Sequence, residues 1–198
     1  GLGLLAGIYL AEFGRDTRFG ALTRLLANLL MGVPSILIGV FVYALLVIPM
    51  GHFSGWAGAV ALGIIMLPVV ARTTEEMLGL VPPELRESGL ALGLPRWKVT
   101  LGLVCRAARG GLLTGILLAV ARVSGETAPL LFTALNSAYW VDSLNQPVAN
   151  LTVTIFNYAM SPYDDWQRMA WGASLVITLA ILALTTAARL LLPGRRKG

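Results

Sequence analysis

A run of 47 residues without a charged side chain, positions 25–71, constrains the fold of this chain more than any other feature. A membrane-spanning helix needs about 20 apolar residues, so the run is long enough for two. Pro49, Gly51 and Gly55 mark a turn between them. Only 13% of all residues are charged, about half the share in an average soluble domain. The sequence therefore predicts an all-α, polytopic transmembrane helical bundle and excludes a disordered chain and most soluble enzymes.

The other apolar segments complete this bundle as one transmembrane domain over residues 1–192. The first segment is too short to span, so we expect it to be the end of a helix and the sequence to be a fragment of a longer chain. The expected spans are 1–11 (partial), 29–48, 56–72, 110–135 and 169–192. The connecting segments are 12–28, 73–109 and 136–167, and residues 193–198 form a basic tail.

The positions of the basic residues predict the orientation of the spans. Successive loops alternate sides, and one side, with residues 12–28, 72–109 and the C-terminal end, carries 13 of the 15 Lys and Arg residues. Loops rich in Lys and Arg lie on the cytoplasmic side of a membrane. We therefore expect the 73–109 loop and the C-terminus to be cytoplasmic and the 136–167 loop to be periplasmic. The net charge of +5 needs no nucleic-acid partner to explain it.

The chain shows no pattern of a catalytic or metal site. It contains none of the sequences GxxxxGK[ST], HExxH or GxSxG. One cysteine, Cys105, and one histidine, His52, are too few for a typical metal site. We expect no catalytic residue, no metal and no cofactor, so any ATP hydrolysis that drives this protein takes place on another chain.

Arg122 and Glu126 are charged residues inside the predicted span 110–135. A charge at a helix centre costs about 2.5–3.5 kcal/mol on insertion scales, and residues four apart share a helix face, so we expect the two to pair. One interpretation is a structural ion pair within the bundle. The other is an anion station, because a guanidinium group matches the oxygens of phosphate. Small residues such as Gly3/Gly7 and Gly111/Gly115 predict close helix contacts.

The segment 81–98 predicts two short cytoplasmic helices. Pro82-Pro83 followed by Glu84 suits a helix start, and Gly93-Leu94-Pro95 suits a break before a second helix. The segment is also too apolar for a free loop and needs a partner surface or the membrane interface. Its large apolar residues are Leu85, Leu90, Leu92, Leu94 and Trp97.

The same segment resembles the EAA loop of ABC importer permeases with the MetI-like fold. Glu87-Ser88-Gly89 is followed after three residues by Gly93 and after nine more by Leu103. Ser88 and Gly89 replace the two alanines of the family, and Cys105-Arg106 replace its Leu-Pro. The resemblance implies a coupling helix that docks on an ATPase subunit, with small residues allowing close approach. The implied docking residues are Glu87, Ser88, Gly89, Leu90, Ala91 and Gly93.

A second resemblance is to the PstA family of phosphate-importer permeases. It is carried by Arg122-Val-Ser-Gly-Glu126-Thr127-Ala-Pro129 and supported by Gly32-Val-Pro-Ser-Ile36, Leu67-Pro-Val-Val-Ala-Arg72 and Ile155-Phe-Asn-Tyr158. It implies a permease of the bacterial inner membrane that imports inorganic phosphate. The implied partners are a second permease subunit (PstC-like), an ATPase dimer (PstB-like), a periplasmic phosphate-binding protein (PstS-like) and membrane lipid.

The resemblance also implies that Arg122, Glu126, Thr127 and Arg72 line the substrate pathway, although Arg72 suits a positive-inside anchor equally well. Three alternatives remain open at this point. The first is an ABC permease for another oxyanion, such as sulfate or molybdate. The second is an ion-coupled secondary transporter that uses Arg122 and Glu126 as a relay, and the third is a membrane scaffold without a transport role.

Overall fold

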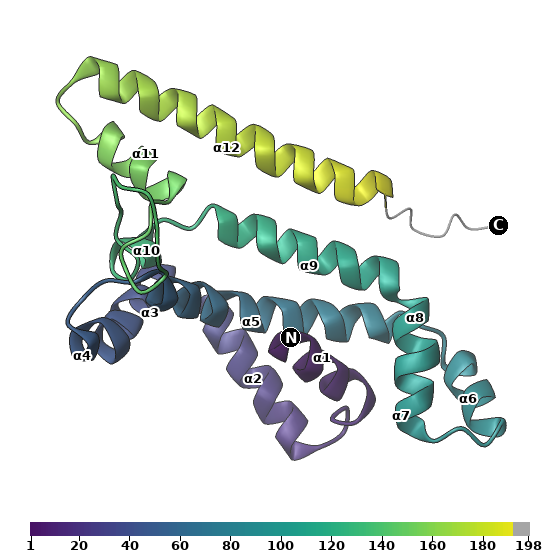
Figure 1. Ribbon diagram of the computed structural model, residues 1–198. Helices are drawn as coiled ribbons and strands as arrows, with labels where there is room; N and C mark the ends of the chain where they lie inside the picture. Colours follow the sequence, from purple (N-terminus) through teal and green to yellow (C-terminus); the bar gives the residue numbers. More distant parts are fainter. Residues whose placement is uncertain (192–198) are drawn as a thin grey trace. The chain divides into compact units, whose positions relative to one another are not determined.

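The structure, a computed structural model, describes residues 1–191 and the side chains of residues 1–187. The predicted basic tail, 193–198, and the last residue of the predicted span 169–192 lie outside these residues. All regular structure in the described residues is helical, as predicted (Figure 1). The elements are α1 (Leu2–Glu12), α2 (Arg18–Gly32), α3 (Ser35–Val42), the π-helix η1 (Tyr43–Val47), α4 (Ile48–Met50), α5 (Gly55–Gly79), α6 (Pro83–Ala91), α7 (Arg96–Val99), the π-helix η2 (Thr100–Val104), α8 (Cys105–Ala107), α9 (Arg109–Ser124), α10 (Ala128–Leu131), α11 (Leu151–Ala159) and α12 (Asp164–Leu191).

Two helices of the described residues, α5 and the 164–187 part of α12, are long and apolar enough to cross a membrane. Two further pairs pass the same test if each bent pair counts as one span: α2 with α3–α4, bent by 99°, and α7–α8 with α9, bent by 73°. The structure therefore offers up to four spans. Helix α2 begins at Arg18, inside the segment that the sequence indicated as a charged connector.

Three prolines have different effects on these helices. Pro34 separates α2 from α3, because the residue before a proline is pushed out of the helical region. Pro49 lies two residues after the end of η1, and a π-helical turn relieves the clash between a proline ring and the carbonyl four residues earlier. Pro68 lies buried within α5, which continues through it.

The described chain forms two compact units. The first comprises residues 1–31 and 66–120 together with the end of α12 from residue 185, and the second comprises residues 32–65 and 121–184.

Close helix contacts at glycine organise the first unit. A Cβ atom on Gly7 would lie 2.5 Å from the Ala71 carbonyl oxygen of α5, and one on Gly3 would lie 2.9 Å from that of Leu67. Gly111 and Gly115 bring α9 equally close to the Met77 and Thr73 side chains of α5. The predicted small-residue contacts are thus confirmed, and Figure 1 shows α1 and α9 alongside α5.

The core of the first unit lies where α5 ends and the α6–α8 segment packs back on it. Leu78 and Val104 are completely buried there, together with Val81, Val99 and Ala108. Ile8 of α1 and Leu85 of α6 pack against this cluster. The 73–109 segment is therefore folded onto the helices that precede and follow it.

The second unit begins with a helical hairpin whose turn falls where the sequence predicts it. Gly51 has a positive φ of 72° and ends α4, and the Ser54 hydroxyl accepts a hydrogen bond from the Ala57 amide at 3.1 Å at the start of α5. Val42 and Ala57, both fully buried, join the two arms of the hairpin.

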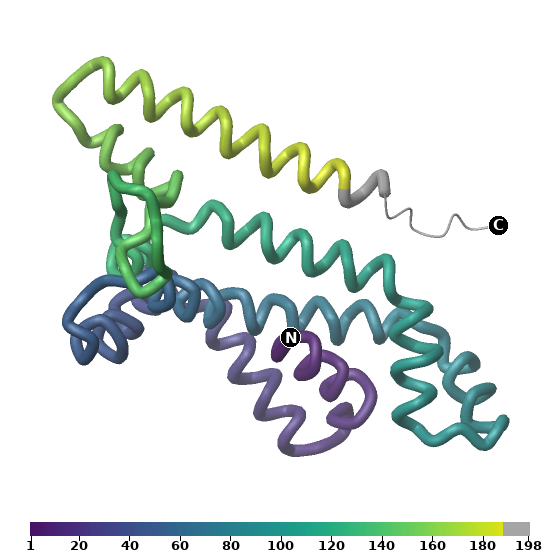
Figure 2. The backbone as a smooth tube through the Cα atoms, viewed as in Figure 1, coloured from purple at the N-terminus to yellow at the C-terminus, as the bar shows by residue number. Residues whose placement is uncertain are grey.

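Helix α10 packs on α3 in the second unit, and the absence of a side chain at Gly39 allows the two helices to approach closely. A Cβ atom on Gly39 would lie 2.6 Å from the Pro129 Cα, a backbone atom that cannot move aside. Two backbone hydrogen bonds hold the 136–150 loop to the start of α5. The Gly55 amide donates to the Gln146 carbonyl oxygen at 3.0 Å, and the Trp56 amide donates to the Leu144 carbonyl oxygen at 3.2 Å. The tube in Figure 2 follows this loop from α10 to α11.

Candidate functional site

The segment that resembles a coupling helix folds as the sequence predicts. Helix α6 starts at Pro83 with Glu84 in its first turn, where a carboxylate favours the helix dipole. The chain reverses at Gly93, whose φ of 77° is a conformation that side chains disfavour. Helix α7 then starts at Arg96.

Gly89, expected to let an ATPase approach closely, is instead buried by its own chain. A Cβ atom there would lie 2.7 Å from Leu103 Cδ1 of η2 and 3.0 Å from the side chain of Val99. The small residue at this position is thus required by the packing of α6 against α7 and η2. The other implied docking residues, Glu87, Ser88, Leu90, Ala91 and Gly93, are exposed.

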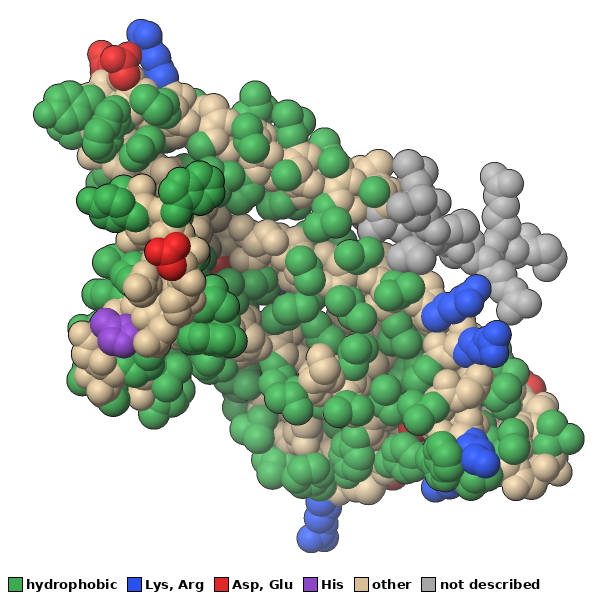
Figure 3. All heavy atoms as spheres, in the orientation of Figure 1, with side chains coloured by type: hydrophobic (Ala, Val, Ile, Leu, Met, Phe, Trp, Pro, Cys, Tyr) green, Lys and Arg blue, Asp and Glu red, His purple; other side chains and the backbone are tan. Residues whose placement is uncertain are grey.

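The free surface of the α6–α7 segment is apolar and basic. Leu92 is 80% exposed and Trp97 57% exposed, and Leu90 and Leu94 are exposed beside them. On the face drawn in Figure 3, Lys and Arg side chains gather over α7 to α9. The exposed basic residues of these helices are Arg96, Lys98, Arg106 and Arg109. Such an apolar surface with a basic margin suits a protein partner.

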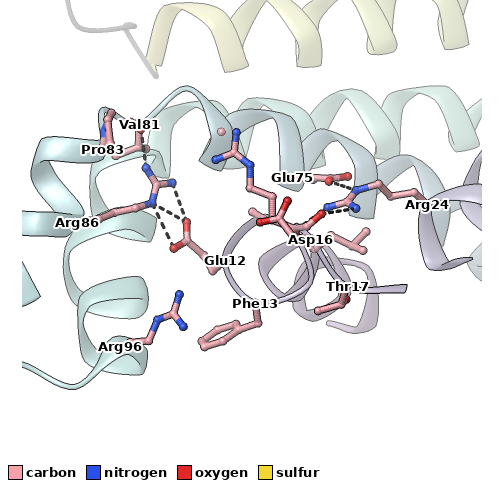
Figure 4. Close-up of a pocket in the computed structure, with 14 residues that line it drawn as sticks. Glu12, Phe13, Asp16, Thr17, Arg24, Glu75, Val81, Pro83, Arg86 and Arg96 are labelled. Atoms are coloured by element: carbon pink, nitrogen blue, oxygen red, sulfur yellow. Dashed lines mark hydrogen bonds and ion pairs between the residues drawn. The ribbon is translucent and has the colours of Figure 1, made fainter. Parts of the chain in front are cut away.

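Arg86, on the inner side of α6, makes the most extensive side-chain contacts in this region (Figure 4). Its Nη2 donates to Glu12 Oε1 at 2.7 Å, and its Nε donates to the same carboxylate at 3.1 and 3.3 Å. It also donates to the carbonyl oxygens of Val81, at 2.6 Å, and Leu78, at 2.7 Å. No local sequence pattern predicts this pair, because its partners are 74 positions apart.

Arg72, a predicted pathway residue, lies in a second charged cluster. Its Nη1 donates to Glu75 Oε2 at 2.6 Å, and its Nη2 lies 3.9 Å from Glu76. Glu75 also accepts a bond of 2.6 Å from Nε of Arg24 on α2. Arg24 and Arg86, but not Arg72, line a cavity of about 740 Å³ that also includes Glu12 and Glu75.

The expected pair of Arg122 and Glu126 is not formed: the described residues contain no ion pair between them. The reason is that α9 ends at Ser124, so Glu126 is no longer one helical turn above Arg122. Arg122 lies in the last turn of α9, where a cation favours the helix dipole, and is exposed. Its guanidinium group has no hydrogen-bond partner in the described part of the chain.

The break after α9 is held by contacts within the second unit. The Thr152 hydroxyl donates to the Glu126 carbonyl oxygen at 3.0 Å, and the Thr127 carbonyl accepts the first amide bonds of α10. Asn150 caps α11, accepting from the Val153 amide at 2.9 Å. An asparagine before an apolar run is the sequence signal that could have predicted this cap. Arg122 thus lies in the last turn of α9, and Glu126 and Thr127 lie in the short segment between α9 and α10.

The described residues contain no cluster of His, Cys, Asp and Glu that could hold a metal. The Arg122 guanidinium offers free donors that suit an oxyanion. The α6–α7 segment offers a surface for a partner.

Comparisons with known proteins agree on one family. The family "Binding-protein-dependent transport system inner membrane component" matches residues 3–196. The phosphate transport system permease protein PstA of Haemophilus influenzae is 53% identical over 96% of this chain, and that of Yersinia pestis is 50% identical over 98%. The chain spans about two thirds of their lengths, 67% and 66%.

A solved structure shares the fold. A chain of the MetNI methionine ABC transporter, in an inward-facing conformation, matches with a TM-score of 0.81 over 96% of this chain and 84% of its own. The two sequences are 16% identical, so this likeness shows the fold alone.

Proposed function

Because this chain belongs to the binding-protein-dependent transport system inner membrane components and, within them, to the PstA permeases, we propose that it lines the pathway of an ATP-driven phosphate importer. It is an inner-membrane permease subunit with the MetI-like fold, and ATP hydrolysis belongs to a separate subunit. The proposed partners are a PstC-like second permease, a PstB-like ATPase dimer and a PstS-like phosphate-binding protein.

The single observation that carries the proposal is the free guanidinium group of Arg122. It is exposed in this chain, beside a break in the helix. An unpaired Arg in a membrane segment is expensive and faces the bundle interior or a water-filled cavity. We assign it as the phosphate contact.

The neighbouring residues take supporting roles in this proposal. Glu126 limits the net positive charge of the empty pathway, so that phosphate does not bind too tightly to leave. Thr127 offers a hydroxyl group at the start of α10. Arg72 is a second pathway candidate whose charge is moderated by Glu75, 2.6 Å away.

The α6–α7 segment is proposed to be the coupling helix. Its exposed residues, among them Glu87, Ser88 and Leu90, would dock on the ATPase, while Gly89 supports the segment from inside. The excess of Lys and Arg on this side supports a cytoplasmic location for it and for the C-terminus. ATP-driven closure of the ATPases would then move α6 and turn the bundle from outward-open to inward-open.

The test uses proteoliposomes that contain the complete importer, with Arg122→Ala combined with Glu126→Ala. We expect the double variant to assemble with its partners and to lose ATP-dependent phosphate uptake. Uptake at the wild-type level would contradict the proposal and favour a scaffold.

Two further measurements separate the alternatives. Wild-type uptake of sulfate or molybdate in place of phosphate would overturn the assignment of the substrate. Uptake by the permease pair alone, without ATPase, would favour an ion-coupled carrier.

A further inference from the structure

Arg86 joins three segments of the first unit. Its guanidinium group binds the carboxylate of Glu12, the last residue of α1. It also binds two carbonyl oxygens, that of Leu78 in the last turn of α5 and that of Val81 just after α5. The Glu12 side chain is only 10% exposed and the Arg86 side chain 25%. Hydrogen bonds between charged groups are short and directional, so this contact fixes α6 on α1 and α5.

A second arginine continues the connection from the same end of α1. Arg24 of α2 donates from Nη2 to the Leu10 carbonyl oxygen at 2.9 Å and from Nε to Glu75 Oε1 of α5 at 2.6 Å. The other oxygen of Glu75 accepts from Arg72 at 2.6 Å. A series of contacts therefore leads from α6 to Arg72: an ion pair joins Arg86 to the end of α1, a hydrogen bond joins the α1 backbone to Arg24, and two further ion pairs meet at Glu75. Figure 4 shows its first members.

The apolar contacts of α6 cannot provide the same link. Leu85 packs on the buried cluster around Leu78, but apolar contacts are non-directional and permit sliding. The Arg86 contact does not permit it, because a displaced guanidinium group would leave the Glu12 carboxylate partly buried without a partner. Arg86 therefore supplies the directional contact between α6 and α1, where the shared apolar cluster supplies a non-directional one.

We propose that Arg86 is a positioning residue for transport, and that its contact with Glu12 passes the displacement of α6 into α1. This rests on the proposed function of α6 as the coupling helix. The ATPase pushes the exposed surface of α6–α7, Arg86 and Glu12 move together, and Arg24 and Glu75 carry the movement to α2 and α5.

The test compares Arg86→Gln with Arg15→Gln in the complete importer. Both arginines line the same cavity, but Arg15 is exposed and has no ion pair in the described residues. Phosphate uptake and ATP hydrolysis are measured on the same proteoliposomes. We expect Arg86→Gln to keep at least half of the hydrolysis stimulated by the binding protein, while phosphate transported per ATP falls at least 10-fold. Arg15→Gln should keep the wild-type ratio.

Glu12→Gln and Asp16→Asn form the matching acidic pair, since Asp16 is exposed in the same cavity. We expect Glu12→Gln to lower the ratio as Arg86→Gln does, and Asp16→Asn to leave it unchanged. Arg86→Lys keeps the charge but loses the forked contact, so its ratio of phosphate transported per ATP should lie between those of the wild type and Arg86→Gln. Equal loss of uptake and hydrolysis in Arg86→Gln would indicate mere misfolding and overturn the proposal.

A covalent link in place of the Arg86–Glu12 ion pair tests the proposal independently of whether the single variants assemble. Cys105 is the only cysteine, so Cys105→Ser provides a background for Glu12→Cys with Arg86→Cys. A short bis-maleimide that joins the two thiols should restore uptake that the unlinked double variant lacks. Failure of the link to restore uptake would overturn the proposal, because α6 would then have to slide past α1. Absence of uptake in the wild type would instead contradict the proposed function, and it is measured first.

Discussion

Arg86 and Arg24 of the first unit and Arg122 of the second each lie beside a helix end, but they differ in what they bind. Arg86 and Arg24 each combine a carboxylate with backbone carbonyl oxygens. Arg122 has neither within the described residues. An arginine with filled donors holds segments of its own chain together, whereas one with free donors can bind an anion from outside. The contacts of the guanidinium group therefore distinguish these roles where the residue type does not.

The largest expected effect is that of Arg122→Gln. Hydrogen bonds to charged groups contribute about 1.5–3 kcal/mol, so the loss of the proposed phosphate contact should lower phosphate uptake about 10- to 100-fold. The melting temperature of the complex should stay the same, since no contact within the described chain is lost. Arg168→Gln, at another exposed arginine, should change neither quantity. A lower melting temperature for Arg122→Gln would show that Arg122, like Arg86 and Arg24, stabilises its own chain, and would contradict its assignment as an arginine with free donors.

Arg24→Gln should show the opposite behaviour, with a loss of stability. Hydrogen bonds to charged groups contribute about 1.5–3 kcal/mol, and this variant loses those to Glu75 and to the Leu10 carbonyl. Thermal unfolding of the purified complex should therefore shift to lower temperature. Arg15→Gln is the control, and equal melting of the two variants would show that the Arg24 contacts add nothing.

Gly39→Ala tests the packing of α10 on α3, next to the break after α9. The new methyl group would meet the Pro129 backbone, and such overpacking costs about 1–3 kcal/mol. The melting temperature should fall, and uptake should fall with it although Arg122 is unchanged. Gly63→Ala makes the same change where nothing lies within 4 Å, so it should be neutral or stabilising. A neutral Gly39→Ala would contradict the tight packing of α10 on α3.

The smallest effect is expected from Leu92→Ala. Leu92 is 80% exposed, so its loss should leave the folded permease intact. We expect affinity for the ATPase to fall about 5-fold, equivalent to about 1 kcal/mol, as measured by co-purification at graded ATPase concentration. Leu80→Ala, at a leucine 75% exposed outside α6 and α7, is the control. Equal affinity in both variants would place the docking surface elsewhere.

Much of the fold follows from local patterns. The uncharged run, the turn at Gly51 and the break at Gly93 each depend on residues close together in the sequence, and the structure confirms the two turns. The contacts at Gly7 and Gly111 are also confirmed, because small residues at regular spacing have few uses in a helix other than close approach.

The site was harder to predict, for two physical reasons. The pairing of Arg122 with Glu126 assumed a continuous helix, and Ser124-Gly125 ends it; the glycine was the signal for that stop. The contact of Arg86 with Glu12 depends on the folding of the 73–109 segment back onto α1, which no spacing in the sequence reveals. Local reasoning finds turns and helix faces, but ion pairs between distant segments require the tertiary structure.

The burial of Gly89 has a consequence for how this family can diverge. Because Leu103 and Val99 of the same chain enclose it, the limit on its size comes from the permease itself. Position 89 should therefore stay small in homologues whatever ATPase they recruit. The exposed positions 92 and 97 meet the partner in our proposal, so they should vary together with the ATPase. An alignment of homologues would then distinguish, within the α6–α7 segment, positions limited by packing inside the permease from positions limited by contact with the ATPase.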